Sequence, residues 1–459
     1  MMNEKMLSAG TAITEITPPV GSIINGDFFP HHAQAVKDPL YAKAMVLQSG
    51  DTRFALVMVD TCSLTYEFLH PVKQKIETAT GVPAQHQLIA ATHIHSGGSV
   101  TGIFLSEVDT AYSNFLADAL VNVVIAACER MTFCEVAYGS AVVPEHVVCR
   151  RYQMKKGFQF PDPLGEGIDA VVTNPFGREE QIMKRTGRTD PELAFMALRS
   201  LEGTWLAVLA NYSLHYVGDF PRTVISADYF GYFARSLKEM LGADPGFVAL
   251  MSNGTSGNVN IWDFLNPGRY PEGAFEKSKL IGSSLAARII ECLPQLQWDA
   301  TATLSVKTAL LELPVRKPTD AALATAQDRL KDREPAMSTD SGPETVALIY
   351  AREQLLLAEE PDHCPVYIQG VRIGTGLIGA LPGEFFAETG LWLKERLHGT
   401  PYFTISLANG NIGYVPPPHE MAAGGYETWR CRASKLEAGA EPVIKAGLEQ
   451  LLRSLQQPG

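Results

Sequence analysis

The 459-residue sequence predicts an α/β fold, in which mixed β-sheets are flanked by α-helices in one large domain over residues 1–459. Segments with the two-residue period of strands alternate along the chain with segments that have the 3.6-residue period of helices. No convincing linker or internal repeat interrupts this alternation. Hydrophobic residues make up 46% of the chain and charged residues 19%, a composition typical of a globular chain that buries a large core.

The order of the expected elements supports this fold class. A hairpin is expected around residues 50–51, and a helix over 66–78 then leads to a strand over 87–91. The other expected strands cover residues 10–19, 134–138, 193–199, 205–211, 247–251, 302–315, 366–381 and 403–407. The other expected helices cover residues 109–131, 228–241, 275–293, 385–397 and 443–455.

Two segments depart from the regular alternation. Residues 319–333 and 343–359 are charged and Ala-rich, which predicts an αα insertion near 318–359 with its turn at 335–342. Residues 155–190 are rich in Gly, Pro and Asp and have no sustained period. We expect this excursion to form a flap or rim over a site, because strand-like segments resume directly after it.

Charge and cysteine content exclude several classes of protein. The net charge is −12 and no Lys/Arg run occurs, which argues against nucleic-acid binding. The seven cysteines are scattered without a CxxC spacing and are expected to be reduced. The first residues lack a signal-peptide apolar core, and no apolar run of about 20 residues is evident. We therefore predict a cytoplasmic protein without an integral membrane segment; the sequence gives no indication of oligomeric state.

A His-x-His pair follows the strand expected at residues 87–91. Residues two apart on an extended chain point to the same side, so His93 and His95 are expected to lie together. The turn Ser96-Gly97-Gly98 leaves space in front of them. This arrangement suits a zinc site with an open coordination position. Two unrelated loop histidines are the alternative, because the motif is weak by itself.

Three further strand ends each supply a possible metal ligand. His215 follows the strand at 205–211, Glu384 follows Pro-Gly at a strand-to-helix junction, and Tyr414 follows the strand at 403–407. Each has a structural alternative: a hydrogen-bonded core histidine, a first-turn glutamate favoured by the helix dipole, and a core tyrosine. The joint pattern is more informative than any single residue. Seven other histidines are expected to be solvated, namely His31, His32, His70, His146, His363, His398 and His419.

Several short motifs, taken together, resemble the amino-terminal catalytic domain of the neutral/alkaline (non-lysosomal) ceramidase family. They are Ala-Thr-His-Ile-His-Ser-Gly-Gly (91–98), Asn-Tyr-Ser-Leu-His (211–215), Ser-Ala-Asp-Tyr (226–229), Leu-Pro-Gly-Glu-Phe (381–385), Gly-Tyr-Val (413–415) and Gly-Tyr-Glu (425–427). Residues 10–19 and 38–43 fit the family's amino-terminal pattern as well. The similarity spans nearly the whole chain in the right order.

This resemblance implies a zinc-dependent hydrolase that cleaves an amide (N-acyl) or related carbonyl bond by attack of zinc-bound water. The implied zinc ligands are His93, His215, Glu384 and Tyr414. His95 is implied as the proton relay, with Tyr426 and Arg150 lining the site and stabilising the oxyanion. Arg150 is the best match to the family's arginine, although Arg151 adjoins it.

Two departures from the family pattern bear on the substrate and the mechanism. Asn260 stands where characterised ceramidases carry a serine proposed to act in catalysis, so direct attack by water is favoured over an acyl-enzyme. The sequence also shows no counterpart of the family's immunoglobulin-like domain. The substrate is therefore left open between a lipid-like N-acyl compound such as ceramide and a smaller polar amide, ester or lactone.

Other functions remain open at this stage. A zinc esterase or lactonase would use the same residues. A two-metal phosphoesterase would need further carboxylates, for which Asp60 and Asp228 are the best-placed candidates. A binding protein with a degenerate site would hold no metal.

Overall fold

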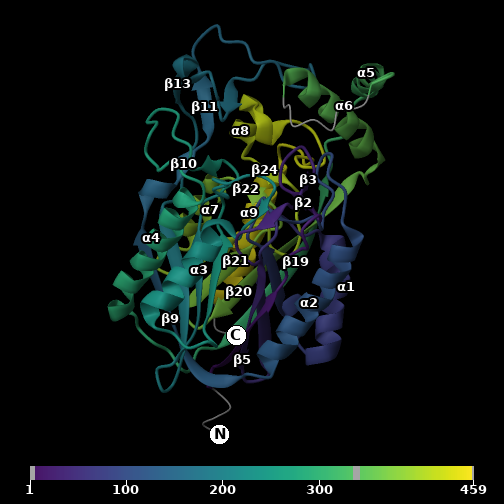
Figure 1. Cartoon of the computed structure of the whole chain (residues 1–459). Helices are drawn as coiled ribbons and strands as arrows, with labels where there is room; N and C mark the ends of the chain where they lie inside the picture. Colours follow the sequence, from purple (N-terminus) through teal and green to yellow (C-terminus); the bar gives the residue numbers. More distant parts are fainter. Residues whose placement is uncertain (1–5, 334–341, 457–459) are drawn as a thin grey trace.

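Two β-sheets packed face to face form the centre of the protein in a computed structural model that describes residues 6–333 and 342–456 (Figure 1). The larger sheet has the order β17 (Val248–Asn253), β15 (Trp205–Tyr212), β14 (Glu192–Ser200), β9 (Thr132–Val142), β1 (Ser8–Glu15), β5 (Tyr41–Ser49), β6 (Thr52–Val59) and β7 (Gln87–Ala91). The smaller sheet has the order β19 (Leu304–Pro314), β20 (His363–Ile373), β21 (Gly376–Ala380) and β23 (Tyr402–Ile405). Both sheets contain parallel and antiparallel pairs, which confirms the predicted mixed α/β class.

Helices cover the outer faces of both sheets. The larger sheet is covered by α1 (Tyr66–Thr80) with α2 (Thr110–Cys128) and by α3 (Asp228–Leu241) with α4 (Glu276–Cys292), two pairs on opposite sides of the view in Figure 1. The smaller sheet is covered by α7 (Ala387–Arg396) and α9 (Ala440–Gln456). The layers therefore run helix, sheet, sheet, helix.

Strand periodicity explains why the central strands are apolar on both faces. In β6, Leu56 and Met58 point into the core between the two sheets, whereas Val57 and Val59 point into the core beneath the helices. Successive side chains of a strand lie on opposite faces, so a strand buried on both sides reads as a continuous apolar run. Each such strand can present polar groups only where it ends.

One segment after β23 joins the two edges of the larger sheet. The Ser406 N–H donates to the Asn253 carbonyl at the end of β17 (2.9 Å). The Leu407 carbonyl accepts from the Ala91 N–H of β7 (3.1 Å), and the Asn409 N–H donates to the Ile89 carbonyl (2.7 Å). Leu407 and Asn409 both have left-handed backbones, with φ of 53° and 64°. This segment brings the carboxyl ends of strands from distant parts of the chain to one place.

Short elements surround that end of the molecule, which is uppermost in Figure 1. Glu384–Phe385 (β22) and Tyr414–Val415 (β24) form a small parallel pair. The excursion contains a three-stranded sheet of β12 (Val171–Thr173), β11 (Arg151–Met154) and β13 (Ile182–Arg185), whose strands are too short to show a period. The other short elements are β2 (Ile23–Asn25), β3 (His31–His32), β4 (Ala35–Val36), β8 (Gly97–Gly98), β10 (Val148–Cys149), β16 (Val224–Ile225), β18 (Val259–Asn260) and α8 (Pro418–Ala423).

The predicted αα insertion is present as α5 (Asp320–Leu330) packed against α6 (Pro343–Glu359). Most of its predicted turn lies outside the described residues. Arg352 on α6 donates to the Phe104 carbonyl (2.8 Å), and Arg329 on α5 donates to the Pro163 carbonyl (2.6 Å). The insertion is thereby attached to the excursion and stands at the same end of the molecule as β22 and β24.

The α2 helix is more apolar than the sequence reading anticipated. An 18-residue stretch of this 19-residue helix has a mean hydropathy of 1.5, and by length and composition it is the one helix among the described residues that could cross a membrane. Its buried residues, which include Leu116, Leu120 and Val124, pack on β1 and β5.

Lys73 of α1 yields a prediction about stability. Its buried ammonium group donates to the Gln87 carbonyl (2.9 Å) and to Oδ1 of Asn409 (2.7 Å). Burial lowers the pKa of Lys73 from 10.5 to about 7. Between these two values the unfolded chain binds more protons than the folded chain, so this residue's contribution to the unfolding free energy rises with pH.

We expect the unfolding free energy of the native chain, measured relative to a Lys73→Met variant by urea denaturation, to increase from pH 7 to pH 10. Lys75→Met is the matched control, because Lys75 lies on the same helix and is exposed beside Asp118. Parallel pH profiles of the unfolding free energy for the native chain and Lys73→Met would contradict the lowered pKa of Lys73.

Candidate metal centre

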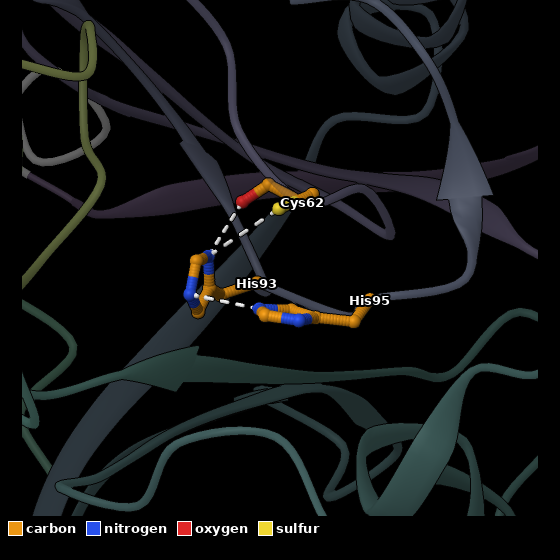
Figure 2. Close-up of side chains that lie close together, drawn as sticks. All are labelled: Cys62, His93 and His95. Atoms are coloured by element: carbon orange, nitrogen blue, oxygen red, sulfur yellow. Dashed lines mark hydrogen bonds between the residues drawn. The ribbon is translucent and has the colours of Figure 1, made fainter. Parts of the chain in front are cut away.

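His93 lies directly after β7 and has a left-handed backbone, with φ of 68°. Such a conformation is uncommon for a non-glycine residue and marks a position held by its surroundings. Nδ1 of its ring lies 2.8 Å from the Cys62 carbonyl, as Figure 2 shows. A carbonyl only accepts hydrogen bonds, so Nδ1 carries the proton and Nε2 keeps a free lone pair. This is the tautomer that a metal ligand requires.

Nε2 of His93 is one of three possible ligand atoms that converge here; the other two belong to His215 and Glu384. Nε2 of His93 lies 3.1 Å from Nε2 of His215 and 3.4 Å from Oε2 of Glu384. Nε2 of His215 lies 3.7 Å from the same carboxylate oxygen. Ligand bonds of about 2.0–2.1 Å in a tetrahedral zinc site place neighbouring ligand atoms roughly 3.3 Å apart. The spacing of His93, His215 and Glu384 therefore fits three ligands of one zinc ion.

The electrostatics of this cluster favour a cation. All three side chains are at least nine-tenths buried, and Oε2 of Glu384 has no hydrogen-bond partner among the described residues. Burial, Arg150 and the neighbouring histidines hold the pKa of His215 well below its usual value. Burial also acts to lower the pKa of His93, but the Glu384 carboxylate raises it well above the usual value. A buried carboxylate is costly without a positive charge beside it; a proton on His93 can supply that charge, and a bound cation would take the place of the proton.

Tyr414 lies beside Glu384 because β24 and β22 pair in parallel with these two residues opposite each other. Its side chain is buried, and its hydroxyl accepts a hydrogen bond from Nη2 of Arg150 (3.1 Å). Burial and the Glu384 carboxylate raise the pKa of Tyr414 well above its usual value. The structure thus brings all four predicted ligand residues to one place, with Tyr414 at its edge.

The three residues predicted to act in catalysis line a cavity of about 740 Å³ that also reaches His215 and Tyr414. Nε2 of His95 lies 3.3 Å from Nε2 of His93, and its ring stacks on Tyr216 with a centroid distance of 3.6 Å. Burial, His93 and Arg150 hold the pKa of His95 well below its usual value. Tyr426 packs edge to face against Tyr414 with a centroid distance of 5.6 Å.

Arg150 and Arg151 have different surroundings. Arg150 lines the cavity, donates through Nε to Glu427 (2.8 Å) and through Nη2 to the Gly257 carbonyl (2.7 Å). Within the described part of the chain, its Nη1 has no such partner and is available to a ligand. Arg151 is fully buried and bonded to Glu420 and Glu427. The geometry therefore favours Arg150 over its neighbour as the arginine of the site.

Sequence reasoning missed two residues that position this site. Glu427 bridges Arg150 and Arg151, and its only sequence signal is its place in the Gly-Tyr-Glu motif. Gly257 approaches the strand of Glu384 so closely that a Cβ there would lie 2.5 Å from the Glu384 carbonyl oxygen. A Gly/Asn loop was expected at 252–260, but its partner across the chain could not be read from the sequence.

Other sequence candidates lie in structural roles. Asp60 accepts from the Tyr41 N–H (3.0 Å) and faces Lys43 (3.8 Å), whereas Asp228 accepts from the N–H groups of Val217 and Gly218. Neither belongs to a metal-ligand cluster within residues 6–333 and 342–456. His146 was expected to be solvated, and this was wrong.

The ring of His146 is buried between Tyr270 and Ser284, which hydrogen-bond its two nitrogens at 3.0 and 3.2 Å. Asn260 is buried too, and its amide donates to Oδ1 of Asn174 (2.5 Å).

Cys62, His93 and His95 form a second possible ligand group (Figure 2). The Cys62 sulfur lies 3.9 Å from Nδ1 of His93, whereas His95 approaches Nε2 on the other side of the ring. Nδ1 is already engaged with the Cys62 carbonyl. This hydrogen bond favours the His93, His215 and Glu384 group as the metal site.

Neither a family model nor a curated protein matches this sequence. Among solved structures, the crystal structure of neutral ceramidase from Pseudomonas aeruginosa aligns with a TM-score of 0.71 and 17% identity, covering 98% of this chain and 74% of that chain. The chain has the fold of neutral ceramidase. A ceramidase structure described as complexed with C2 aligns equally well, with a TM-score of 0.71 and 17% identity over 98% of this chain and 75% of the other. The ceramidase fold thus confirms, at the level of architecture, the resemblance seen in the short motifs.

The ligand geometry predicts the metal content of a variant. A His93→Ala, His215→Ala double substitution removes two of three converging ligands, so we expect the purified protein to lose its metal by elemental analysis. His363→Ala is the control, since His363 is exposed and belongs to neither possible ligand group. Undiminished metal in the double variant would contradict this site.

Proposed function

We propose that this chain is a zinc-dependent hydrolase that cleaves the amide bond of an N-acyl substrate. The observation that carries the proposal is the convergence of His93, His215 and Glu384 beside a cavity lined by His95, Arg150 and Tyr426. The ceramidase fold supports the same reaction class. Imidazole and carboxylate ligands, with the Tyr414 phenol beside them, suit zinc.

Zinc at such a site supplies Lewis-acid chemistry: it brings the pKa of water towards about 7 and polarises a carbonyl oxygen. The residues of the chain supply the proton transfers. His95 Nε2 takes the proton of the attacking water and passes it to the amide nitrogen as the C–N bond breaks, which yields a carboxylate and an amine. The cavity holds the acyl group close to His95.

Arg150 and Tyr426 stabilise the negative charge that develops on the carbonyl oxygen. The Nη1 group of Arg150 and the Tyr426 hydroxyl are donors at the cavity wall. Glu427 fixes the guanidinium, so its orientation is set before the reaction begins. Asn260 has no hydroxyl and lies against Asn174, and Ser256 donates to Asn253 (2.5 Å) outside the cavity lining. This arrangement favours direct attack by water over an acyl-enzyme.

A zinc esterase or lactonase is the second candidate, because the same residues would act on an ester carbonyl. A two-metal phosphoesterase is not favoured, since Asp60 and Asp228 bind backbone groups. The substrate class is therefore tested by hydrolysis of matched N-acyl amides, acyl esters and lactones.

We expect the purified protein to contain one zinc per chain and to hydrolyse an N-acyl amide. A chelator such as 1,10-phenanthroline should abolish turnover, and added zinc should restore it. Full activity in a metal-free preparation would contradict the proposal, and a preference for esters or lactones would support the second candidate.

His95→Ala separates catalysis from metal binding. The substitution leaves His93, His215 and Glu384 in place, so zinc content should be unchanged while kcat falls by about 10²–10⁴-fold. His363→Ala again serves as the control. Loss of zinc in His95→Ala would show that His95 is a ligand instead.

A further inference from the structure

The cavity beside the candidate metal centre is lined in part by charged groups that the proposed chemistry does not use. Five charged side chains line it: Asp27, Arg150, Asp162, Arg178 and Arg329. Arg150 is paired with Glu427, and the Asp27 carboxylate is paired with Arg222 and His31. Three charged side chains of the lining remain to be explained, namely Asp162, Arg178 and Arg329.

Arg178 and Arg329 have no carboxylate partner among the described residues. The Arg178 guanidinium lies over the Phe160 ring, 5.1 Å from its centroid. Arg329 donates through Nη1 to the Pro163 carbonyl (2.6 Å). Phe160 and Pro163 belong to the same stretch of the excursion, so both arginines flank one rim segment. Asp162 lies between these two residues in the chain, and its Oδ1 caps a turn by accepting from the Gly165 and Glu166 N–H groups.

An apolar wall lies along the same cavity. Phe158 and Phe160 stack with a centroid distance of 6.4 Å, and Phe160 stacks on Trp429 at 6.4 Å. On the inner side, Phe28 contacts Tyr426 edge to face at 5.9 Å. The lining thus combines the polar side chains beside the candidate metal centre, several aromatic rings and two guanidiniums that have no carboxylate partner among the described residues.

We propose that the substrate is an N-acyl amide that carries a carboxylate, such as an N-acyl amino acid, and that Arg178 and Arg329 bind this carboxylate. The inference rests on the proposed function for the position of the scissile bond. Among the described lining residues that remain, two guanidiniums against the single carboxylate of Asp162 leave one positive charge, which matches a monoanion better than a phosphate dianion. A cavity of about 740 Å³ accommodates a ligand of this size.

Planar guanidinium groups bind carboxylates through paired N–H donors, so arginine is suited to this role. The aromatic wall would contact the apolar part of the substrate. A neutral amide of the same size would leave both guanidiniums without a partner. We therefore expect kcat/KM to favour the carboxylate about tenfold, which corresponds to roughly 1.4 kcal/mol.

The test compares N-octanoylglycine with its neutral analogue N-octanoylglycinamide, with release of octanoic acid as the readout. The native chain should show kcat/KM about tenfold higher for the carboxylate. In an Arg178→Gln, Arg329→Gln variant this ratio should fall to about one through a rise in KM for N-octanoylglycine. Arg188→Gln is the control, because Arg188 pairs with Glu395 on the surface and does not line the cavity.

Equilibrium binding of both compounds to His95→Ala, with and without the two arginine substitutions, separates the two proposals. If the protein hydrolyses both compounds, and neither activity nor binding shows a preference for the carboxylate, the carboxylate site is overturned and the hydrolase remains supported. If no hydrolysis occurs but the protein binds the carboxylate selectively, and the double substitution removes this selectivity, the hydrolase is overturned and the carboxylate site is supported. If the protein shows neither hydrolysis nor selective binding, both proposals are overturned.

Discussion

Three buried side-chain atoms that could bind a metal lie within 3.7 Å of one another, and the rest of the candidate site is arranged around them. Such a cluster is unfavourable in an apolar interior, because the Glu384 carboxylate and two imidazole nitrogens repel each other without a cation. The Cys62 carbonyl fixes the proton of His93 on the far side of the ring. Arg150 provides positive charge nearby, but it is already committed to Glu427. A bound divalent metal would satisfy the cluster directly.

The fold holds this cluster together through backbone contacts. The segment 406–409 bonds to the ends of β7 and β17, and the Leu407 N–H donates to the Gly383 carbonyl beside Glu384 (3.2 Å). The Asn409 side chain fixes the end of this segment: it accepts a hydrogen bond from Lys73 and donates to Gln369 of the smaller sheet (2.8 Å). His93 and Glu384 are thus fixed by neighbouring residues of the main chain, and two positive φ angles in the segment are the cost of that connection.

Local patterns predicted much of the fold but little of its assembly. The strand–helix–strand order of residues 54–91 and the hairpin of residues 193–211 depend on nearby residues, and both are present. The short strands β12 and β13 escaped prediction because three or four residues cannot display a period. His146 was misassigned because its two partners, Tyr270 and Ser284, lie more than 120 residues away.

The residues of the candidate site could likewise be predicted only in part from the sequence. Strand ends identified His93, His215, Glu384 and Tyr414 as candidate ligands, and the family resemblance grouped them as one site and added Arg150, Tyr426 and the role of His95. The sequence could not reveal that Glu427 orients Arg150 or that Tyr216 stacks on His95, because both contacts depend on tertiary packing. The sequence likewise could not reveal that Arg178 of the excursion and Arg329 of the αα insertion line one cavity, both without a carboxylate partner among the described residues.

X-ray absorption spectroscopy at the zinc edge of the purified protein tests the central claim most directly. The account predicts one zinc per chain with a shell of nitrogen and oxygen ligands at about 2.0–2.2 Å that includes two imidazoles. A sulfur ligand at about 2.3 Å would instead assign the metal to the group containing Cys62. Either that sulfur shell or the absence of any bound metal would contradict the assignment to His93, His215 and Glu384.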